Sequence, residues 1–216
     1  MFEDIREKIT RNILEIKLWI ENIEENRNNM DFQATCYGLF FVYLYGVYEA
    51  IVKQVIFITI DELNHAGIGI DSCIYELYPV LLSNEYDSLY QVGNDKKWER
   101  RWDISRKLSS NNSISIPNAL FPTDGRNIKV RQLESLKNSF GINRDVLSRP
   151  EIGGYIQEMV DHRNHIAHGD VLPKEVGRRY TKNDILNLCA NISEECNYLC
   201  EIYEDYLVER KYVRQA

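Results

Sequence analysis

A long apolar segment at residues 34–60 constrains the fold of this chain more than any other feature. Glu49, Lys53 and Gln54 interrupt it, and the apolar run before Glu49 is shorter than the roughly 18 residues that a membrane-spanning helix requires. Its tyrosines suit a packed protein interior better than lipid: Tyr37, Tyr43, Tyr45 and Tyr48. We therefore expect a central buried helix, running from about residue 31 to residue 63, and no membrane partner.

Isoleucines at spacings of four and three predict an amphipathic helix before this segment, with an apolar stripe at Ile5, Ile9, Ile13, Ile16, Ile20 and Ile23. Residues 152–166 predict a third helix, whose apolar face includes Arg163. Gly169 and Pro173 end this helix. A last helix starts at Thr181, which Asp184 supports as a capping box, and continues to about residue 206. Four to five long helices predict an all-α bundle.

The segment from 82 to 150 is more polar than the rest of the chain. It contains a Ser/Asn cluster and turn signals, but also one short amphipathic pattern at residues 130–140. Asn127 is a candidate cap for that helix and Gly141 its stop. With 216 residues, the chain is expected to form a single domain, 1–216, with an insertion at roughly 82–150.

The net charge of −7 argues against a surface that attracts nucleic acid everywhere, so any RNA site must be a local basic patch. The five cysteines form no CxxC pair and fall mostly in apolar helical stretches. This usage is typical of reduced core thiols in a cytoplasmic protein. The sequence shows no zinc signature, phosphate-binding loop or dinucleotide fingerprint, and we therefore expect no metal and no cofactor.

Residues 163–170, RNHIAHGD, combine an arginine with two histidines where a helix ends. A guanidinium can hold a phosphodiester while an imidazole moves a proton, and this chemistry needs no metal. Arg163 and His168 lie about 140° apart around an ideal helix, so two copies facing each other would bring the groups together. The same residues also suit a structural role, with Arg163 paired to a carboxylate and His168 decorating a helix C-terminus.

The Arg-x-x-x-x-His spacing resembles the motif of the HEPN superfamily, many of whose members cut RNA without a metal. The preceding helix, YIQEMVDHRN, and the stretches YGVYEAIVK and NIKVRQLESLKNSFGI resemble the bacterial branch known as MAE-type or RiboL-PSP-like HEPN proteins. The resemblance implies a helical bundle that forms a homodimer, sets two motifs across a cleft, and cleaves RNA to leave a cyclic phosphate.

By the same resemblance, Arg163 and His168 are the catalytic pair and Asn164 a polar assistant. His165 is not fixed by the motif and also fits a surface imidazole. Glu49 and Lys53 resemble a supporting Glu-x-x-x-Lys element, in which Glu49 would pair with Arg163; a purely structural Glu49–Lys53 ion pair is the alternative.

A second candidate contact for RNA alternates cations with tryptophans around residues 96–107. Lys97, Trp98, Arg100 and Arg101 would bind single-stranded RNA through phosphates and stacked bases. The alternative is an amphipathic helix that buries both tryptophans, Trp98 and Trp102, in the core.

Taken with the resemblance, these residues predict a cytoplasmic, metal-independent endoribonuclease, acting as a toxin or abortive-infection effector in bacterial defence. Its partners would be RNA, a second copy of the chain, and an antitoxin or defence protein. The alternatives are a non-catalytic module that binds RNA, a nucleotide or a protein, and a purely structural dimerisation protein.

Overall fold

The protein is described here by a computed structural model that covers residues 1–25, 29–110 and 112–215. Within these ranges the chain forms α-helices and two short 3₁₀ helices, and no β-strand. The all-α fold predicted from the sequence is confirmed. In chain order the elements are α1 (Glu3–Glu25), α2 (Met30–His65), η1 (Ile70–Ser72), η2 (Tyr75–Leu77), α3 (Tyr78–Leu81), α4 (Ser83–Gln91), α5 (Lys97–Leu108), α6 (Val130–Ser139), α7 (Ile152–Ala167), α8 (Pro173–Gly177) and α9 (Lys182–Val208).

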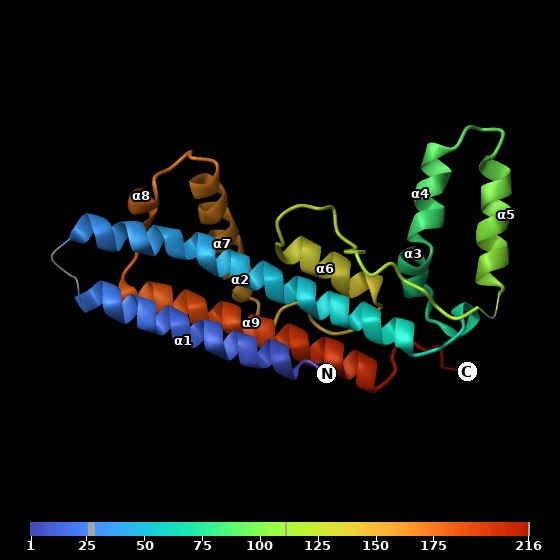
Figure 1. Ribbon diagram of the computed structural model, residues 1–216, viewed down its shortest axis with the longest axis horizontal. Helices are drawn as coiled ribbons and strands as arrows, with labels where there is room; N and C mark the ends of the chain where they lie inside the picture. The colour runs from blue at the N-terminus through green and yellow to red at the C-terminus, as the bar shows by residue number, and fades with distance from the viewer. Residues whose placement is uncertain (26–28, 111, 216) are drawn as a thin grey trace.

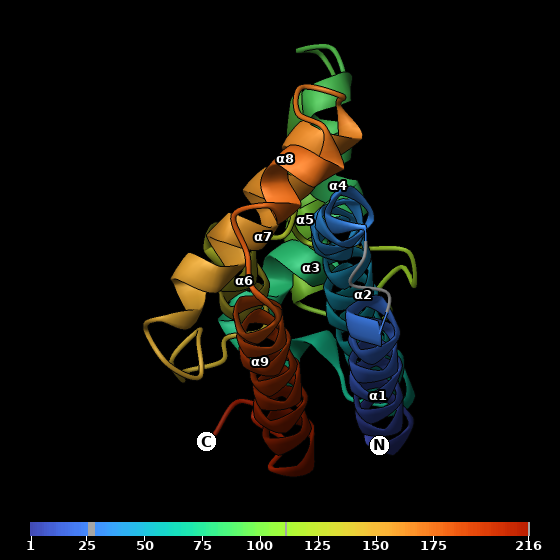
Figure 2. The same ribbon diagram turned by 90° about the vertical axis from the view of Figure 1, so that its left-hand side faces the viewer.

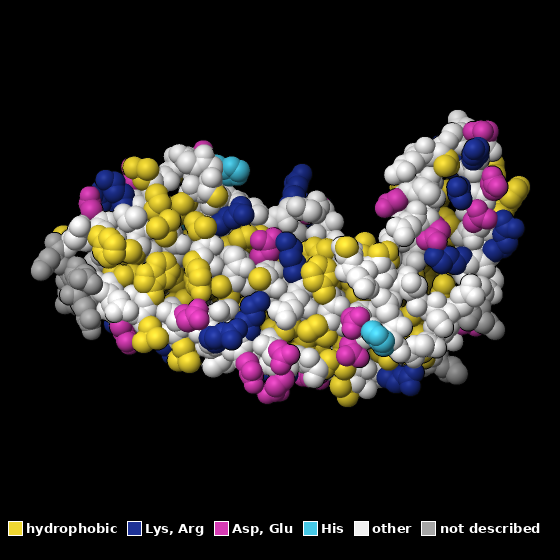
Figure 3. All heavy atoms as spheres, in the orientation of Figure 1, with side chains coloured by type: hydrophobic (Ala, Val, Ile, Leu, Met, Phe, Trp, Pro, Cys, Tyr) yellow, Lys and Arg dark blue, Asp and Glu magenta, His cyan; other side chains and the backbone are white. Residues whose placement is uncertain are grey.

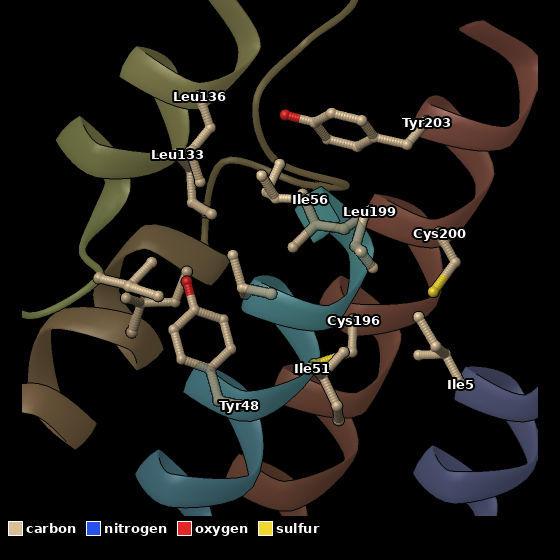
Figure 4. Close-up of a cluster of buried hydrophobic side chains, with 14 of the residues drawn as sticks. Ile5, Tyr48, Ile51, Ile56, Leu133, Leu136, Cys196, Leu199, Cys200 and Tyr203 are labelled. Atoms are coloured by element: carbon tan, nitrogen blue, oxygen red, sulfur yellow. The ribbon is translucent and has the colours of Figure 1, made fainter. Parts of the chain in front are cut away.

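Three long helices, α1, α2 and α9, lie side by side along the long axis, with α1 antiparallel to the other two (Figures 1 and 2). The predicted isoleucine stripe of α1 faces this bundle, although Ile13 is only partly buried. Figure 4 shows the centre of the core, where side chains from α1, α2, α6 and α9 meet, among them Ile5, Ile51, Leu136 and Leu199.

The central helix α2 packs against α1, α7, α8 and α9. The side chain of Asn29 caps it, accepting a hydrogen bond of 3.0 Å from the backbone N–H of Phe32. By length and composition alone, α2 is the one helix in the described part of the chain that could span a membrane. In the structure it is the shared wall of the bundle, with buried side chains along its whole length.

Two glycines let the short helix α8 lie directly against α2. A Cβ atom at Gly38 would fall 1.9 Å from the carbonyl oxygen of Pro173, and one at Gly177 would fall 1.8 Å from that of Ala34. No side chain fits in either place. This close contact lies only a few residues after the RNHIAHGD motif, so it anchors the chain that follows the motif-bearing helix α7 against α2.

The polar segment at 82–150 contains more helix than its sequence suggested. Helices α4 and α5 form a hairpin that projects from one end of the molecule, whereas α6 packs on the bundle (Figure 1). The amphipathic pattern at 130–140 is confirmed as α6, and Gly141 follows its end with a positive φ of 65°. The predicted cap is wrong: Lys129 is the N-cap residue, and its backbone N–H is bound by the side chain of Gln132.

Candidate active site

The motif arginine lies at the edge of the core. Helix α7 is anchored by buried side chains at helical spacing, and Arg163 and Ile166 continue this face as half-buried residues. Arg163 is therefore held between the bundle and solvent instead of extending freely from the surface. The buried anchors are Ile152, Ile156, Met159 and Val160.

The guanidinium of Arg163 is positioned by an aromatic ring. Its Cζ atom lies 4.9 Å from the centroid of the Tyr45 ring on α2, a cation–π contact. Its Nη1 also donates a 3.0 Å hydrogen bond to Oδ1 of Asn164. Among the described residues no carboxylate forms an ion pair with Arg163, so its charge is not neutralised by the protein there. The expected structural pairing with a carboxylate is not what the structure shows.

A hydrogen-bond network fixes the groups that hold Arg163. Oδ1 of Asn164 accepts a second bond of 2.7 Å from the side-chain amide of Asn127. The hydroxyl of Tyr45 donates to Oδ1 of Asn127 over 3.3 Å and accepts 3.1 Å from the backbone N–H of Ile128. Asn127 thus links α2 to α7. Burial raises the pKa of the Tyr45 hydroxyl, which the Ile128 N–H and the charge of Arg163 partly offset.

His168 ends α7 and points its imidazole to solvent. Its backbone N–H still donates to the carbonyl of Asn164 over 2.9 Å, and its φ and ψ remain helical, at −84° and −7°. Gly169 then reverses the chain with a φ of 77°. Because the helix continues to His168, the angular separation of about 140° from Arg163 applies. The side chain has no hydrogen-bond or ion-pair partner among the described residues, and it is exposed.

The remaining predicted residues of the motif region are also at the surface. His165 is exposed, with its Nδ1 3.4 Å from a carboxylate oxygen of Asp170. Glu49 binds Lys53 across one turn of α2 at 2.9 Å, and both side chains are partly exposed. The predicted pairing of Glu49 with Arg163 is absent from the ion pairs of the described residues. Glu49 is instead one turn beyond Tyr45, and its charge contributes to raising the pKa of that tyrosine.

Sequence reasoning missed a partly buried contact beside the motif. The hydroxyl of Tyr180 donates to Glu158 over 2.7 Å, and Nε2 of His162 lies 2.6 Å from the same hydroxyl oxygen. Since the only proton of that hydroxyl goes to Glu158, Nε2 of His162 must carry the proton that it donates to Tyr180. The ring of Phe41 packs 4.8 Å from both rings, and burial lowers the pKa of His162. This contact ties α7 to the segment between α8 and α9.

The cysteines take no part in the site. All five are free and buried: Cys36, Cys73, Cys189, Cys196 and Cys200. Burial raises the pKa of the Cys200 thiol to about 11, and that of Cys196 is raised as well, so both remain protonated. Within the described ranges, no group of three or more His, Cys, Asp or Glu side chains is placed to hold a metal ion.

The cation- and tryptophan-rich segment lies away from the motif, on α5 of the projecting hairpin (Figure 1). Trp98 is 60% exposed and Trp102 59% exposed, so the alternative in which both are buried in the core is wrong. Lys97, Arg100 and Arg101 lie on the same helix, and the guanidinium of Arg101 stacks 4.7 Å from the Trp98 ring.

Comparison with known protein families identifies a match. The family described as HEPN_MAE_28990-like HEPN matches residues 1–212, from α1 to beyond the end of α9. No curated protein and no solved structure matches significantly. HEPN domains are often ribonucleases, and the family indicates a nuclease or an RNA-binding module. Because the match covers nearly the whole chain, this protein belongs to the HEPN family, in the MAE-type group that its motif and central helix resemble.

Proposed function

We propose that this protein is a metal-independent endoribonuclease in which Arg163 and His168 are the catalytic residues. The observation that carries the proposal is the setting of Arg163, a half-buried guanidinium held by a ring and an amide, with no carboxylate partner in the described chain. Proteins usually pair a partly buried charge. An arginine left without an anion is therefore suited to bind one, and its fork geometry matches a phosphate.

The proposed reaction uses the 2′-hydroxyl of RNA as the nucleophile. The His168 imidazole takes the hydroxyl proton, and the 2′-oxygen attacks the adjacent phosphorus. The P–O2′ bond forms as the P–O5′ bond breaks. The departing 5′-oxygen receives a proton from a His168 imidazolium, the form that this side chain has after it takes the hydroxyl proton. The products are a 2′,3′-cyclic phosphate and a 5′-hydroxyl. Arg163 stabilises the charge that builds up on the phosphoryl oxygens, while Asn164 holds the guanidinium in place.

The proposal includes a homodimer with the motif at its interface. Arg163 and His168 diverge around α7, so one chain does not readily direct both groups at one phosphate. Two copies related by a two-fold axis would place Arg163 of each beside His168 of the other. The exposure of the His168 imidazole leaves it available for such a site.

The biological role that we propose is that of a cytoplasmic toxin or abortive-infection effector in bacterial defence, controlled by an antitoxin or another partner protein. The resemblance of the chain to bacterial HEPN proteins suggests this role, and the family match over residues 1–212 agrees with that resemblance. A local RNA site also fits the net charge of −7, which argues against a surface that attracts nucleic acid everywhere.

The test is incubation of the purified protein with labelled single-stranded RNA in EDTA, alongside Arg163→Ala, His168→Ala and His165→Ala. We expect cleavage by the wild type and by His165→Ala, which removes an exposed imidazole from the same helix end, and none by the other two. Intact RNA with the wild type, bound in a stable complex, would instead establish the non-catalytic RNA-binding module. Equal cleavage by all four proteins would contradict the assigned residues.

The shared site can be tested by mixing two inactive variants. If Arg163 and His168 of opposite copies act together, Arg163→Ala mixed with His168→Ala regains one intact site in each mixed dimer, about a quarter of wild-type activity after subunit exchange. If each chain supplies its own pair, the mixture remains inactive although both variants exchange subunits.

A further inference from the structure

The α4–α5 hairpin exposes large side chains that the bundle does not use. Helix α4 has no buried residue and α5 has only Ile104, in this described part of the chain. Tyr90 is 90% exposed, and Trp98 and Trp102 are each more than half exposed. In Figure 3 hydrophobic and charged side chains alternate over the hairpin, which stands apart from the bundle across a hollow in the outline. Exposed aromatic rings on one projecting element indicate a surface for a ligand.

The two helices flank an open pocket of about 360 Å³. Tyr86, Leu89 and Tyr90 line it from α4, and Lys97 and Arg101 line it from α5. Its size is in the range of ligand-binding clefts, which begin at roughly 300 Å³. The lining combines two aromatic rings with two cations, the side chains that bind the base and the phosphate of a nucleotide.

The charge of the hairpin favours an anionic ligand. Residues 83–108 hold six Lys or Arg and five Asp or Glu, a net charge of +1 in a chain of −7. Three of the cations are paired: Arg100 and Arg106 with Asp103, and Lys107 with Glu85. The two pocket cations, Lys97 and Arg101, have no carboxylate partner within the described residues, and Arg101 stacks on Trp98 instead.

We propose that the α4–α5 hairpin is a docking site for single-stranded RNA. Tyr86 and Tyr90 stack bases, while Lys97 and Arg101 contact phosphates. Single strands are the fitting form because only unpaired bases present their faces to aromatic side chains. The inference rests on the proposed function, since it supplies that site with a means of holding its substrate.

The placement of the hairpin agrees with this role. The hairpin and α7 both project from the same side of α2, with α6 between them (Figure 1). A strand held at the hairpin can thus extend over α6 toward the motif at the end of α7. The catalytic and docking elements would share one substrate, each contacting a different part of it.

Fluorescence anisotropy with a labelled single-stranded RNA of mixed sequence tests the proposal, in EDTA and in a His168→Ala background that prevents cleavage. Tyr90→Ala should weaken binding roughly 5-fold or more, whereas Tyr90→Phe, which keeps the ring, should bind normally. Arg101→Ala should weaken binding and reduce the salt dependence by about 0.7 in the slope of log K against log salt. Arg11→Ala, an exposed cation on α1, is the matched control and should change nothing.

Unchanged affinity in both Tyr90→Ala and Arg101→Ala would overturn the proposal and leave the hairpin as a surface for another class of partner. Failure of the docking proposal can be distinguished from failure of the ribonuclease proposal. If the wild type cleaves RNA but the hairpin variants bind and cleave equally well, the docking site is wrong and the ribonuclease stands. If binding depends on Tyr90 but the wild type never cleaves, the docking site stands alone.

Discussion

The guanidinium of Arg163 lies over the ring of Tyr45, with Cζ 4.9 Å from the ring centroid. This contact joins the motif helix α7 to the central helix α2, and the hydroxyl of the same tyrosine binds Asn127 and the backbone of Ile128. One buried side chain therefore positions the arginine both directly, through its ring, and indirectly, through the amide network that ends at Asn164. The orientation of Arg163 depends on residues outside the motif.

Replacing Tyr45 should separate its two roles. Tyr45→Phe keeps the ring under Arg163 but leaves the buried N–H of Ile128 without a partner, which should cost about 1–3 kcal/mol in the free energy of unfolding. Tyr45→Leu also removes the cation–π contact, so it should lose much more cleavage activity than Tyr45→Phe. Urea denaturation and initial cleavage rates measure both. Equal rates for the two variants would show that the ring does not position Arg163.

Asn127 should act as a positioning residue at a distance from the chemistry. Asn127→Asp replaces the amide donor with a carboxylate oxygen, so the 2.7 Å bond to Asn164 is lost and a negative charge is introduced near Arg163. We expect kcat to fall by up to about 100-fold, as for a catalytic group displaced by an ångström. Asn138→Asp, an exchange of the same chemistry on α6 outside this network, is the control. A normal rate in Asn127→Asp would remove the network from the account.

The contact between α2 and α8 should be intolerant of a single methyl group. Gly38→Ala places Cβ against the carbonyl of Pro173 and should destabilise the fold by about 1–3 kcal/mol. Gly46→Ala on the same helix meets nothing within 4 Å and should instead stabilise it by roughly 0.5–1 kcal/mol. Thermal or urea unfolding compares them. The account of α8 packing is contradicted if both substitutions shift stability in the same direction.

His162 should make stability fall on mild acidification. Burial lowers its pKa in the folded protein, so the unfolded chain binds a proton at a higher pH than the folded chain does. This contribution to stability is fully present above a pH of roughly 6.5 and is lost as the pH falls toward the lowered value. Urea unfolding across this range measures it. His162→Gln should remove this part of the pH dependence, and His165→Gln, at an exposed position, should keep it.

The long helices were predictable because their signals are local. The isoleucine spacing of α1 and the Thr181–Asp184 capping box of α9 need only neighbouring residues, and the structure contains both. Helix α4 was not predicted, because its apolar pattern is short, with Tyr86, Leu89 and Tyr90 at helical spacing, and none of its residues is buried.

The motif itself could be found from its spacing, but not the groups that hold it. Asn127 precedes a helix and fits the pattern of a cap, yet its partner is Asn164, far along the chain. In the sequence, Tyr45 cannot be distinguished from the other tyrosines of the central helix. Only the packing of α2 on α7 places its ring beneath Arg163. Contacts between distant segments follow from the tertiary fold, which local patterns do not encode.

The most direct test of the central claim is the chemistry of the cut ends. Wild-type protein is incubated in EDTA with a single-stranded RNA and with the same sequence carrying 2′-O-methyl groups, and the products are analysed by mass spectrometry. We predict that only the RNA is cut, leaving 2′,3′-cyclic phosphate and 5′-hydroxyl ends, and that His168→Ala leaves it intact. Cleavage of the 2′-O-methyl strand, or products with 5′-phosphate ends, would contradict a reaction in which His168 activates the 2′-hydroxyl.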